Sequence, residues 1–368
     1  MIKRIYIDNY RCFRNFELRL DDLPCSMIIG GNGTGKSTVG EVLGIFRAIG
    51  LGVSNVNSVM PRYAKSILKP KFDDKHSDVI TLELDACDED NTWRYSLVVE
   101  SAGLDYRVKE ERLVSADKNV FARSALNLSE TTIAMAVAGD GVSDRTWVTD
   151  FRKILAAIYI VRPNPRLMGN LLDDVGAKPT TDLFNFANWL PGILSSSQAA
   201  YEMFTDYMSF VLQDFLGVEI LNTARDGQRL MVRFKTGGEP EEVMSIMFSA
   251  LSDGEKCQMV AGAIVALNER ITNLTVFWDE PDNYITTSEI TNLLVALCNR
   301  FQKKGQLIVS SHSREAIAAF GENEVLCFRR TSHYSSVRQP ERVGEMRAGG
   351  VLSGALDEAL LMGGLNNE

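Results

Sequence analysis

The stretch that decides the fold is Gly30-Gly31-Asn32-Gly33-Thr34-Gly35-Lys36-Ser37, which fits the pattern G-x-x-x-x-G-K-[ST]. Glycines in such a loop let the backbone fold so that its N–H groups face phosphate oxygens, and the N-terminus of a following helix adds positive potential. Lys36 is then expected to reach the β- and γ-phosphates of a nucleotide, and the Ser37 hydroxyl to bind Mg²⁺. Thr38 is expected near the α-phosphate. The remaining residues of this P-loop that we expect around the phosphates are Asn32, Gly33, Thr34 and Gly35.

The sequence on both sides of the P-loop has the periodicity that such a loop requires. Before it, Ser26-Met27-Ile28-Ile29 is a short apolar run typical of a buried strand. After it, apolar residues recur at helical spacing, at Val39, Val42, Leu43 and Phe46. An ordinary glycine-rich turn is the alternative, but a chance match to the whole pattern has a probability on the order of one per cent. Strand, loop and helix together predict a phosphate-binding site.

A second motif is an apolar strand that ends in two carboxylates, Leu274-Thr275-Val276-Phe277-Trp278-Asp279-Glu280-Pro281. This is the pattern of a Walker B motif, in which Asp279 holds the Mg²⁺ shell and Glu280 polarises the attacking water. Many core strands end in solvated acidic residues, so the functional interpretation depends on the P-loop in the same chain.

Two further motifs are weak when taken alone. The segment 250–256, Ala-Leu-Ser-Asp-Gly-Glu-Lys, opens a helix, and its Ser252 and Gly254 suit an anion site built from N-cap geometry and the helix dipole. The same residues also make an ordinary N-cap turn. The segment 307–313 is an apolar strand that ends in His312, and a lone histidine is more often structural than catalytic. The order of the four motifs along the chain favours the functional interpretation of both.

In this order the motifs resemble the ABC-type ATPase heads of the SMC/RecF/OLD superfamily. Asp279 lies 27 residues after Ser252, and His312 lies 33 residues after Asp279, as in that family. The resemblance spans most of the chain, from the turn Asn9-Tyr10-Arg11 to about Arg330. It implies an α/β fold: a P-loop NTPase head of the ABC type, with a mixed central sheet, an antiparallel β lobe and an inserted helical subdomain.

The resemblance also implies how the site works. ATP and Mg²⁺ are the implied cofactors, and the implied assembly is a head-to-tail homodimer with two ATP molecules between the subunits. Ser252 and Gly254 would close over the nucleotide of the other subunit, which makes dimerisation ATP-dependent. The other implied roles are catalysis by Glu280, Lys36 and His312, γ-phosphate sensing by His312, a phosphate contact by Arg11, and a subunit-facing D-loop at Asp282 and Asn283.

The sequence departs from the family pattern at two points. Asp253 stands where the signature segment LSGGE usually has its first glycine, so a carboxylate lies close to where an anion is expected to dock. That carboxylate either points away from the site or changes the closure of the dimer. The glutamine of the Q-loop has no clear counterpart, since Gln198 and Gln213 both fall in a segment with a helical pattern.

The rest of the chain divides into three parts. Residues 1–160 form the N-terminal part of the head, with the P-loop and the β lobe, residues 161–245 a mainly helical insertion, and residues 246–368 the C-terminal part. Residues 3–20 alternate as two antiparallel strands, with Ile5 and Ile7 on one face and Phe16, Leu18 and Leu20 on another. Residues 78–114 alternate with period two around a polar turn at 88–91, whereas residues 115–160 show no clear pattern.

The second half of the chain changes from helices to strands and back. Beyond the prolines at 163 and 165 the stretch to about 220 is predicted to be mainly helical, and further prolines at 179 and 191 exclude a long coiled coil. Residues 218–236 are predicted as strands around an Asp226-Gly227 turn. From Ser249 onward helix and strand alternate, as in a parallel α/β sheet.

Composition is that of an average soluble protein, with 368 residues, 45% hydrophobic, 24% charged and a net charge of −9. This charge disfavours a surface built throughout for nucleic acid. We expect a cytosolic protein, because neither a secretion signal nor an apolar run of roughly 18 residues is apparent. The six cysteines lack the spacing of zinc ligands or of a disulfide frame.

Three functions fit this type of head. The leading hypothesis is an ATP-driven dimeric switch that controls a partner effector, a nuclease or toxin, because the segments 161–165 and 183–187 resemble stand-alone ATPases of anti-phage systems. The alternative is a RecF-like, DNA-binding repair ATPase, for which a C-terminal basic stretch is the evidence. That stretch contains Arg329, Arg330, Arg338, Arg342 and Arg347. A transporter subunit is a weaker alternative, because 215 residues separate Ser37 from Ser252.

Overall fold

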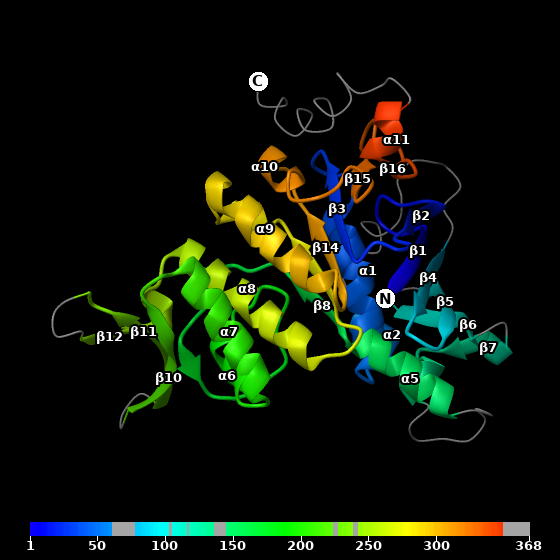
Figure 1. Ribbon diagram of the computed structural model, residues 1–368. Helices are drawn as coiled ribbons and strands as arrows, with labels where there is room; N and C mark the ends of the chain where they lie inside the picture. The colour runs from blue at the N-terminus through cyan, green and yellow to red at the C-terminus, as the bar shows by residue number, and fades with distance from the viewer. Residues whose placement is uncertain are drawn as a thin grey trace. The chain divides into compact units, whose positions relative to one another are not determined.

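The computed structural model describes residues 1–60, 78–102, 105–115, 118–135, 145–223, 227–237 and 242–348 (Figure 1). The chain folds into two compact units, which we call the first and the second unit. The first contains Met1–Ile160, Asn273–Asp279 and Gly305–Glu368, and the second contains Val161–Thr272 and Glu280–Lys304. Within the described ranges no helix combines the length and the apolar character that crossing a bilayer requires.

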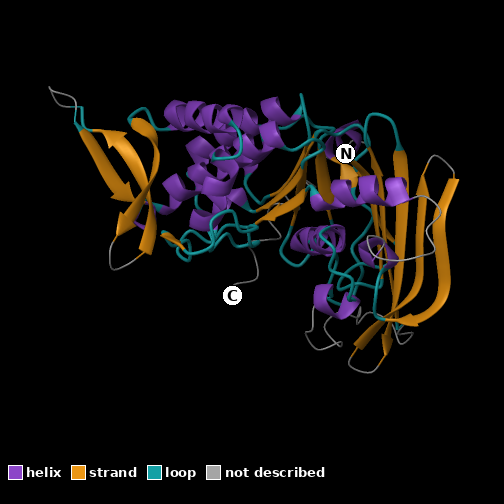
Figure 2. Ribbon diagram, turned by 90° about the horizontal axis from the view of Figure 1, so that it is seen from below, coloured by secondary structure: helices purple, strands orange, loops and turns teal. Residues whose placement is uncertain are grey.

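An antiparallel sheet of six strands forms one layer of the first unit (Figure 2). In spatial order its strands are β2 (Phe16–Arg19), β1 (Ile2–Asp8), β4 (Val79–Cys87), β5 (Thr92–Ala102), β6 (Asp105–Ser115) and β7 (Lys118–Leu128). The predicted strands of residues 3–20 and 78–114 are confirmed. They also belong to one sheet, because β1 pairs with both β2 and β4.

One expectation about these strands is wrong. Ile5 lies opposite Leu18 and Ile7 lies opposite Phe16. Residues directly opposite each other in an antiparallel pair project to the same side of the sheet. The two apolar rows therefore share one face, the face on which all four side chains are fully buried.

A second, mixed sheet in the first unit carries the predicted motifs at the ends of its strands. Its order is β16 (Glu341–Arg342), β15 (Val325–Phe328), β3 (Cys25–Gly30), β14 (Gln306–Ser310), β13 (Thr275–Asp279) and β8 (Ile158–Val161). The strands β15, β3, β14 and β13 are parallel, and β16 is antiparallel to β15. Every residue of β3, β13 and β14 is buried, as expected for central parallel strands.

Helix α1 (Lys36–Gly50) connects the two sheets through one core. The four residues predicted to share its buried face, Val39, Val42, Leu43 and Phe46, are all fully buried. Gly40 allows the close approach of β13, because a Cβ there would lie 2.7 Å from a ring carbon of Phe277. The shorter helices of this unit are α2 (Val56–Val59), α4 (Thr132–Met135), α5 (Arg145–Ala156), α10 (Arg314–Ile317) and α11 (Val343–Ala348).

A buried carboxylate on β6 holds the start of α4 against the sheet. Glu111 is fully buried and accepts hydrogen bonds from the Tyr95 hydroxyl at 2.9 Å and from the N–H groups of Thr132 at 2.5 Å and Ile133 at 3.2 Å. These donors replace the water that the carboxylate loses on folding. Burial and the neighbouring Glu111 raise the pKa of Tyr95 well above its usual value.

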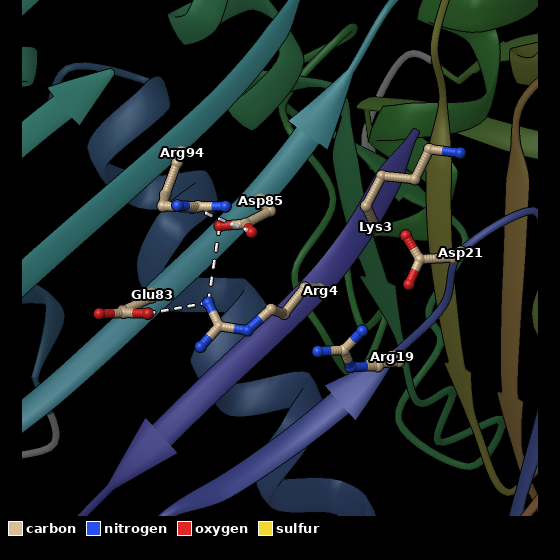
Figure 3. A pocket seen from close by; sticks show the side chains of 7 residues that line it. All are labelled: Lys3, Arg4, Arg19, Asp21, Glu83, Asp85 and Arg94. Atoms are coloured by element: carbon tan, nitrogen blue, oxygen red, sulfur yellow. Dashed lines mark hydrogen bonds and ion pairs between the residues drawn. The ribbon is translucent and has the colours of Figure 1, made fainter. Parts of the chain in front are cut away.

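The opposite face of the antiparallel sheet carries a network of ion pairs (Figure 3). Arg4 is its centre, with nitrogens 2.6 Å from Glu17, 2.8 Å from Glu83 and 3.6 Å from Asp85. Arg94 contacts the other oxygen of Asp85 at 3.3 Å. The hydrogen bond from Arg4 lowers the pKa of Glu17.

The second unit contains the long helices α6 (Phe186–Leu194), α7 (Gln198–Val211), α8 (Asp253–Arg270) and α9 (Thr287–Phe301). Its antiparallel sheet has the order β10 (Phe215–Thr223), β11 (Gly227–Lys235), β12 (Val243–Met247), and β9 (Leu171–Leu172) also pairs with β11. The predicted strands of 218–236 are confirmed, and Asp226 of the predicted turn lies outside the described residues. The predicted alternation of helix and strand after Ser249 is also confirmed.

The prediction of a mainly helical stretch up to residue 220 holds for 186–211. It is wrong for 166–185 and for 215–220, which belong to β10. Side-chain amides hold that stretch in an irregular path, since Asn185 accepts from the Thr180 N–H and Asn188 accepts from Asp173 and Asp174. Such bonds offer the backbone an alternative to helix. Pro191 also lies inside α6 and does not end it.

Candidate functional site

The P-loop connects β3 to α1, and its backbone needs glycine at two of its positions. Gly30 has φ 153°, and a Cβ there would lie 2.5 Å from the Phe328 carbonyl oxygen. Gly35, the N-cap of α1, has φ 92°, and a Cβ there would lie 2.6 Å from a ring carbon of Phe13. Both conformations are costly for other residues. Asn32 and Gly33 are exposed at the tip of the loop, whereas Thr34, Lys36 and Thr38 are buried.

The Lys36 ammonium lies inside this loop. It donates hydrogen bonds to the carbonyls of Gly30 at 2.8 Å and Gly31 at 3.3 Å, and its Nζ is 2.8 Å from His312 Nε2. An ammonium can only donate, so this contact is a hydrogen bond in the tautomer of His312 that leaves Nε2 without a proton. The structure therefore brings together two of the predicted catalytic residues, which are 276 positions apart in the sequence.

Asp279 ends β13 at the same edge of the sheet. The register places it beside Ser310 of β14, which in turn lies beside Ile28 of β3, two residues before the P-loop begins. The buried Ser310 hydroxyl donates a hydrogen bond to Asp279 Oδ1. Asp279 is 4% exposed, so this bond orients its carboxylate.

These residues fit Mg²⁺. Asp279 supplies a buried carboxylate that is already oriented by a neighbour, and Ser37 supplies a hydroxyl in the first turn of α1. Hard oxygen ligands of this kind suit Mg²⁺, which usually keeps several waters and binds one or two protein groups plus phosphates.

Glu280 begins the second segment of the second unit. Its backbone is left-handed, with φ 53° and ψ 58°, which is an unusual conformation for a residue with a long side chain. Its Oε2 accepts a hydrogen bond from Asn283 Nδ2 at 3.0 Å and lies 3.6 Å from Arg162 Nη2. Asp282 and Asn283 belong to the 3-10 turn Pro281–Asn283 that follows.

The signature segment forms the N-terminus of α8. Ser252 is the N-cap and forms a reciprocal capping box with Glu255. Asp253 points to Arg166, with a distance of 3.6 Å between their charged atoms. Gly254 has the Tyr284 carbonyl oxygen 3.4 Å from where a Cβ would stand, and the buried Lys256 donates to the Pro165 carbonyl at 3.1 Å.

Arg11 follows β1 and has a left-handed backbone with φ 51°. Its Nε is 2.6 Å from Glu41 Oε2 on α1. The guanidinium thus lies against the helix that the P-loop opens, and its contact with a phosphate remains a prediction.

Comparison with known proteins agrees with this architecture. Residues 1–91 match the family model of the AAA ATPase domain. No curated protein matches the sequence. Among solved structures, an SMC head bound to the C-winged helix domain of ScpA is similar, with 12% identity, a TM-score of 0.58, and coverage of 94% of this chain and 99% of that one. An SMC head domain with an extended coiled coil, bound to the C-terminal domain of ScpA and derived from Pyrococcus furiosus, covers 96% and 98% at 12% identity and a TM-score of 0.55.

The chain has the fold of an SMC head. The expected α/β head of the ABC type is thus confirmed as a fold, with its mixed sheet, its antiparallel lobe and its helical part. Within this fold, Lys36, His312, Asp279 and the P-loop belong to the first unit. Glu280, Ser252 and Gly254 belong to the second.

Sequence reasoning missed three residues that contact predicted site residues. Ser310 orients Asp279, and Arg162 contacts Glu280. Arg330 follows β15 and donates to the carbonyls of Gly33 at 3.0 Å, His333 at 2.7 Å and Ser335 at 2.8 Å. Ser310 lies inside the apolar motif 307–313, whereas no local pattern distinguishes Arg330 from the other C-terminal arginines.

Proposed function

We propose that this SMC-type head binds and hydrolyses Mg-ATP, closes as a head-to-tail dimer, and acts as a switch that controls a partner effector, a nuclease or toxin, in anti-phage defence. The observation that supports it most is the convergence at one sheet edge of Lys36, His312 and the oriented Asp279 beside the P-loop. Ligands of open α/β sheets bind at the carboxyl ends of the strands.

Each residue has a role that follows from its chemistry. The buried Lys36 ammonium exchanges its contact with His312 for the β- and γ-phosphate oxygens. His312, in the tautomer that carries its proton on Nε2, then donates to the γ-phosphate. Ser37 and Asp279 would hold Mg²⁺, which would supply positive charge for the phosphate oxygens. Glu280 accepts the proton of the attacking water.

Dimer closure is supported by the geometry of the signature segment. Ser252 and Gly254 lie at the start of an 18-residue helix, where backbone N–H groups and the helix dipole favour an anion. Asp253 replaces the usual first glycine of the signature segment. Arg166 lies beside it and compensates its negative charge. The acidic residue therefore leaves the helix N-terminus suited to a phosphate of the partner subunit's nucleotide.

The effector role is favoured over DNA repair. The segments 161–165 and 183–187 resemble stand-alone ATPases of anti-phage systems. Two arginines of the basic stretch act inside the protein: Arg330 binds three carbonyls, and Arg329 lies 3.7 Å from Glu341. Both guanidinium groups therefore have partners within the protein, which lowers the weight of the basic stretch as a sign of DNA binding.

Two variants test the nucleotide chemistry. Lys36→Ala is expected to abolish ATP binding, measured by calorimetry, because it removes the ammonium for the phosphates. Glu280→Gln is expected to keep ATP binding, lose hydrolysis and accumulate as a nucleotide-bound dimer, measured as mass in solution with and without Mg-ATP. If Glu280→Gln hydrolyses ATP as fast as the wild type, the role of Glu280 is refuted. A mass that stays monomeric with Mg-ATP refutes the shared site.

Phage challenge tests the cellular role. Bacteria that carry the gene with its genomic neighbours are expected to give fewer plaques than cells that carry Lys36→Ala in the same context. Equal plaque numbers, with both proteins present at equal levels, would contradict a defence role and leave the nucleotide chemistry standing.

A further inference from the structure

The carboxylate of Glu280 is contacted by side chains from different parts of the second unit. Asn283 contacts Oε2 from the turn that follows Glu280 itself, at 3.0 Å. Arg162 reaches the same oxygen from the segment after β8, at 3.6 Å, although it is 118 positions away in the sequence. The Glu280 side chain is 19% exposed, so these contacts restrict it in a partly enclosed place.

Arg162 reaches Glu280 from a backbone that is itself fixed. Its N–H donates to the Thr181 carbonyl at 2.7 Å, and the N–H of Asn164 donates to the Asp182 carbonyl at 2.9 Å. Pro163 follows Arg162 directly and restricts it to an extended conformation. The segment 162–166 is therefore anchored at the arginine itself and two residues beyond it.

The same segment contacts the start of α8. Arg166 lies 3.6 Å from Asp253, and the Pro165 carbonyl accepts a hydrogen bond from the buried Lys256 at 3.1 Å. Residues 162–166 thus contact both the carboxylate of Glu280 and the signature segment, and all of these residues belong to the second unit.

We propose that Arg162 is a positioning residue for Glu280: from the anchored segment 162–166 it fixes the orientation of the carboxylate that accepts the proton of the attacking water. This inference rests on the proposed function. A glutamate side chain has several rotamers, and the planar guanidinium restricts those of Glu280 in a way that an ammonium does only in part. Arg162 acts through Glu280 and contacts no nucleotide in this role.

The test is a steady-state comparison of Arg162→Ala with the wild type. The expected result is a fall in kcat of about tenfold, with KM for Mg-ATP changed by less than about twofold, because the phosphate-binding groups are untouched. Arg162→Lys is expected to recover part of the rate. Added guanidinium ion at millimolar concentration is expected to raise the rate of Arg162→Ala and leave the wild type unchanged, since the Arg162 side chain is 55% exposed and its place is open to solvent.

A matched control exists in the same unit. Arg233 pairs with Glu219 at 3.8 Å between neighbouring strands, and Arg233→Ala removes an ion pair of the same kind away from the motifs. It is expected to keep the kcat and KM of the wild type. Melting temperature and circular dichroism of all variants show whether each is folded, and Arg162→Lys decides the test if Arg162→Ala is not.

The outcomes separate the inference from the proposed function. If Glu280→Gln abolishes hydrolysis while Arg162→Ala keeps the wild-type kcat, the inference is overturned and the proposed function stands. An equal loss in kcat with Arg233→Ala, or a folded Arg162→Ala that guanidinium does not stimulate, also overturns it. Hydrolysis that persists in Glu280→Gln refutes the role on which both statements rest.

Discussion

Replacing Arg330 with alanine tests whether the tip of the P-loop is held in its binding conformation from β15. The guanidinium donates to three carbonyls, of which Gly33 belongs to the P-loop and His333 and Ser335 to the loop 331–335. Without it, Gly33 loses its connection to that loop. In the variant, the P-loop without nucleotide is therefore less ordered, and part of the free energy of ATP binding is spent on ordering it.

The magnitude follows from the contact with Gly33. A hydrogen bond from a charged donor contributes roughly 1.5–3 kcal/mol when buried, and this bond, 3.0 Å long, is exposed to solvent. We therefore expect about 1 kcal/mol of lost preorganisation, or a Kd for Mg-ATP about fivefold higher. Hydrolysis at saturating ATP is expected to stay near the wild-type rate, because neither Asp279 nor Glu280 is affected.

Calorimetric titration with a non-hydrolysable ATP analogue measures this effect. Arg338→Ala is the matched control, since it removes the same charge eight positions further on, where the side chain is exposed. Arg330→Lys keeps the charge and loses the three-way geometry, so it is expected to resemble Arg330→Ala. If Arg330→Ala binds as tightly as the wild type, or loses no more affinity than Arg338→Ala, the reasoning is refuted.

Three other perturbations address the metal, the core and the pH dependence. Ser310→Ala removes the donor to Asp279 and is expected to raise the Mg²⁺ concentration for half-maximal hydrolysis about tenfold; an unchanged Mg²⁺ requirement would show that Asp279 needs no such support. Glu111→Leu leaves the Tyr95 hydroxyl and two N–H groups without their acceptor, so urea unfolding is expected to show a loss of about 3 kcal/mol or more, whereas Tyr95→Phe costs less because Glu111 keeps two donors. The pKa of Glu17 is lowered in the folded state by the hydrogen bond from Arg4, so its contribution to stability is present above the unfolded pKa of about 4.3 and is lost as the pH falls further. The urea midpoint is therefore expected to fall more between pH 7 and pH 3 in the wild type than in Glu17→Gln, and equal falls would contradict this account.

The parts of the site that sequence could predict are those formed by motifs of consecutive residues. Gly30 to Ser37 and the strand that ends at Asp279 combine a local conformation with a local chemistry, and the structure has both at the end of a buried parallel strand. The N-cap at Ser252 was predictable for the same reason, since a capping box needs only residues three positions apart.

The contacts that sequence could not predict join distant positions and have no local pattern. Arg330 reaches Gly33 across 297 positions, and nothing in the neighbourhood of an arginine states which carbonyl it will bind. The pairing of β1 with β4 could not be predicted either. Alternation with period two shows that a strand has a buried face, but it does not show which strand lies beside it.

The irregular stretch 166–185 was misassigned for a different reason. Its backbone bonds are satisfied by the side chains of Asn185 and Asn188, and such bonds carry no periodic signal.

Because the backbone of Glu280 is left-handed, the residue that gives the highest stability at this position differs from the residue that gives activity. Glycine adopts φ 53° without strain, whereas a residue with a Cβ loses roughly 1–2 kcal/mol there. A library screened for thermal resistance alone is therefore expected to enrich Gly at position 280, together with loss of hydrolysis. Screening the same library for ATP turnover should return Glu at that position, so the two selections would diverge at this one codon.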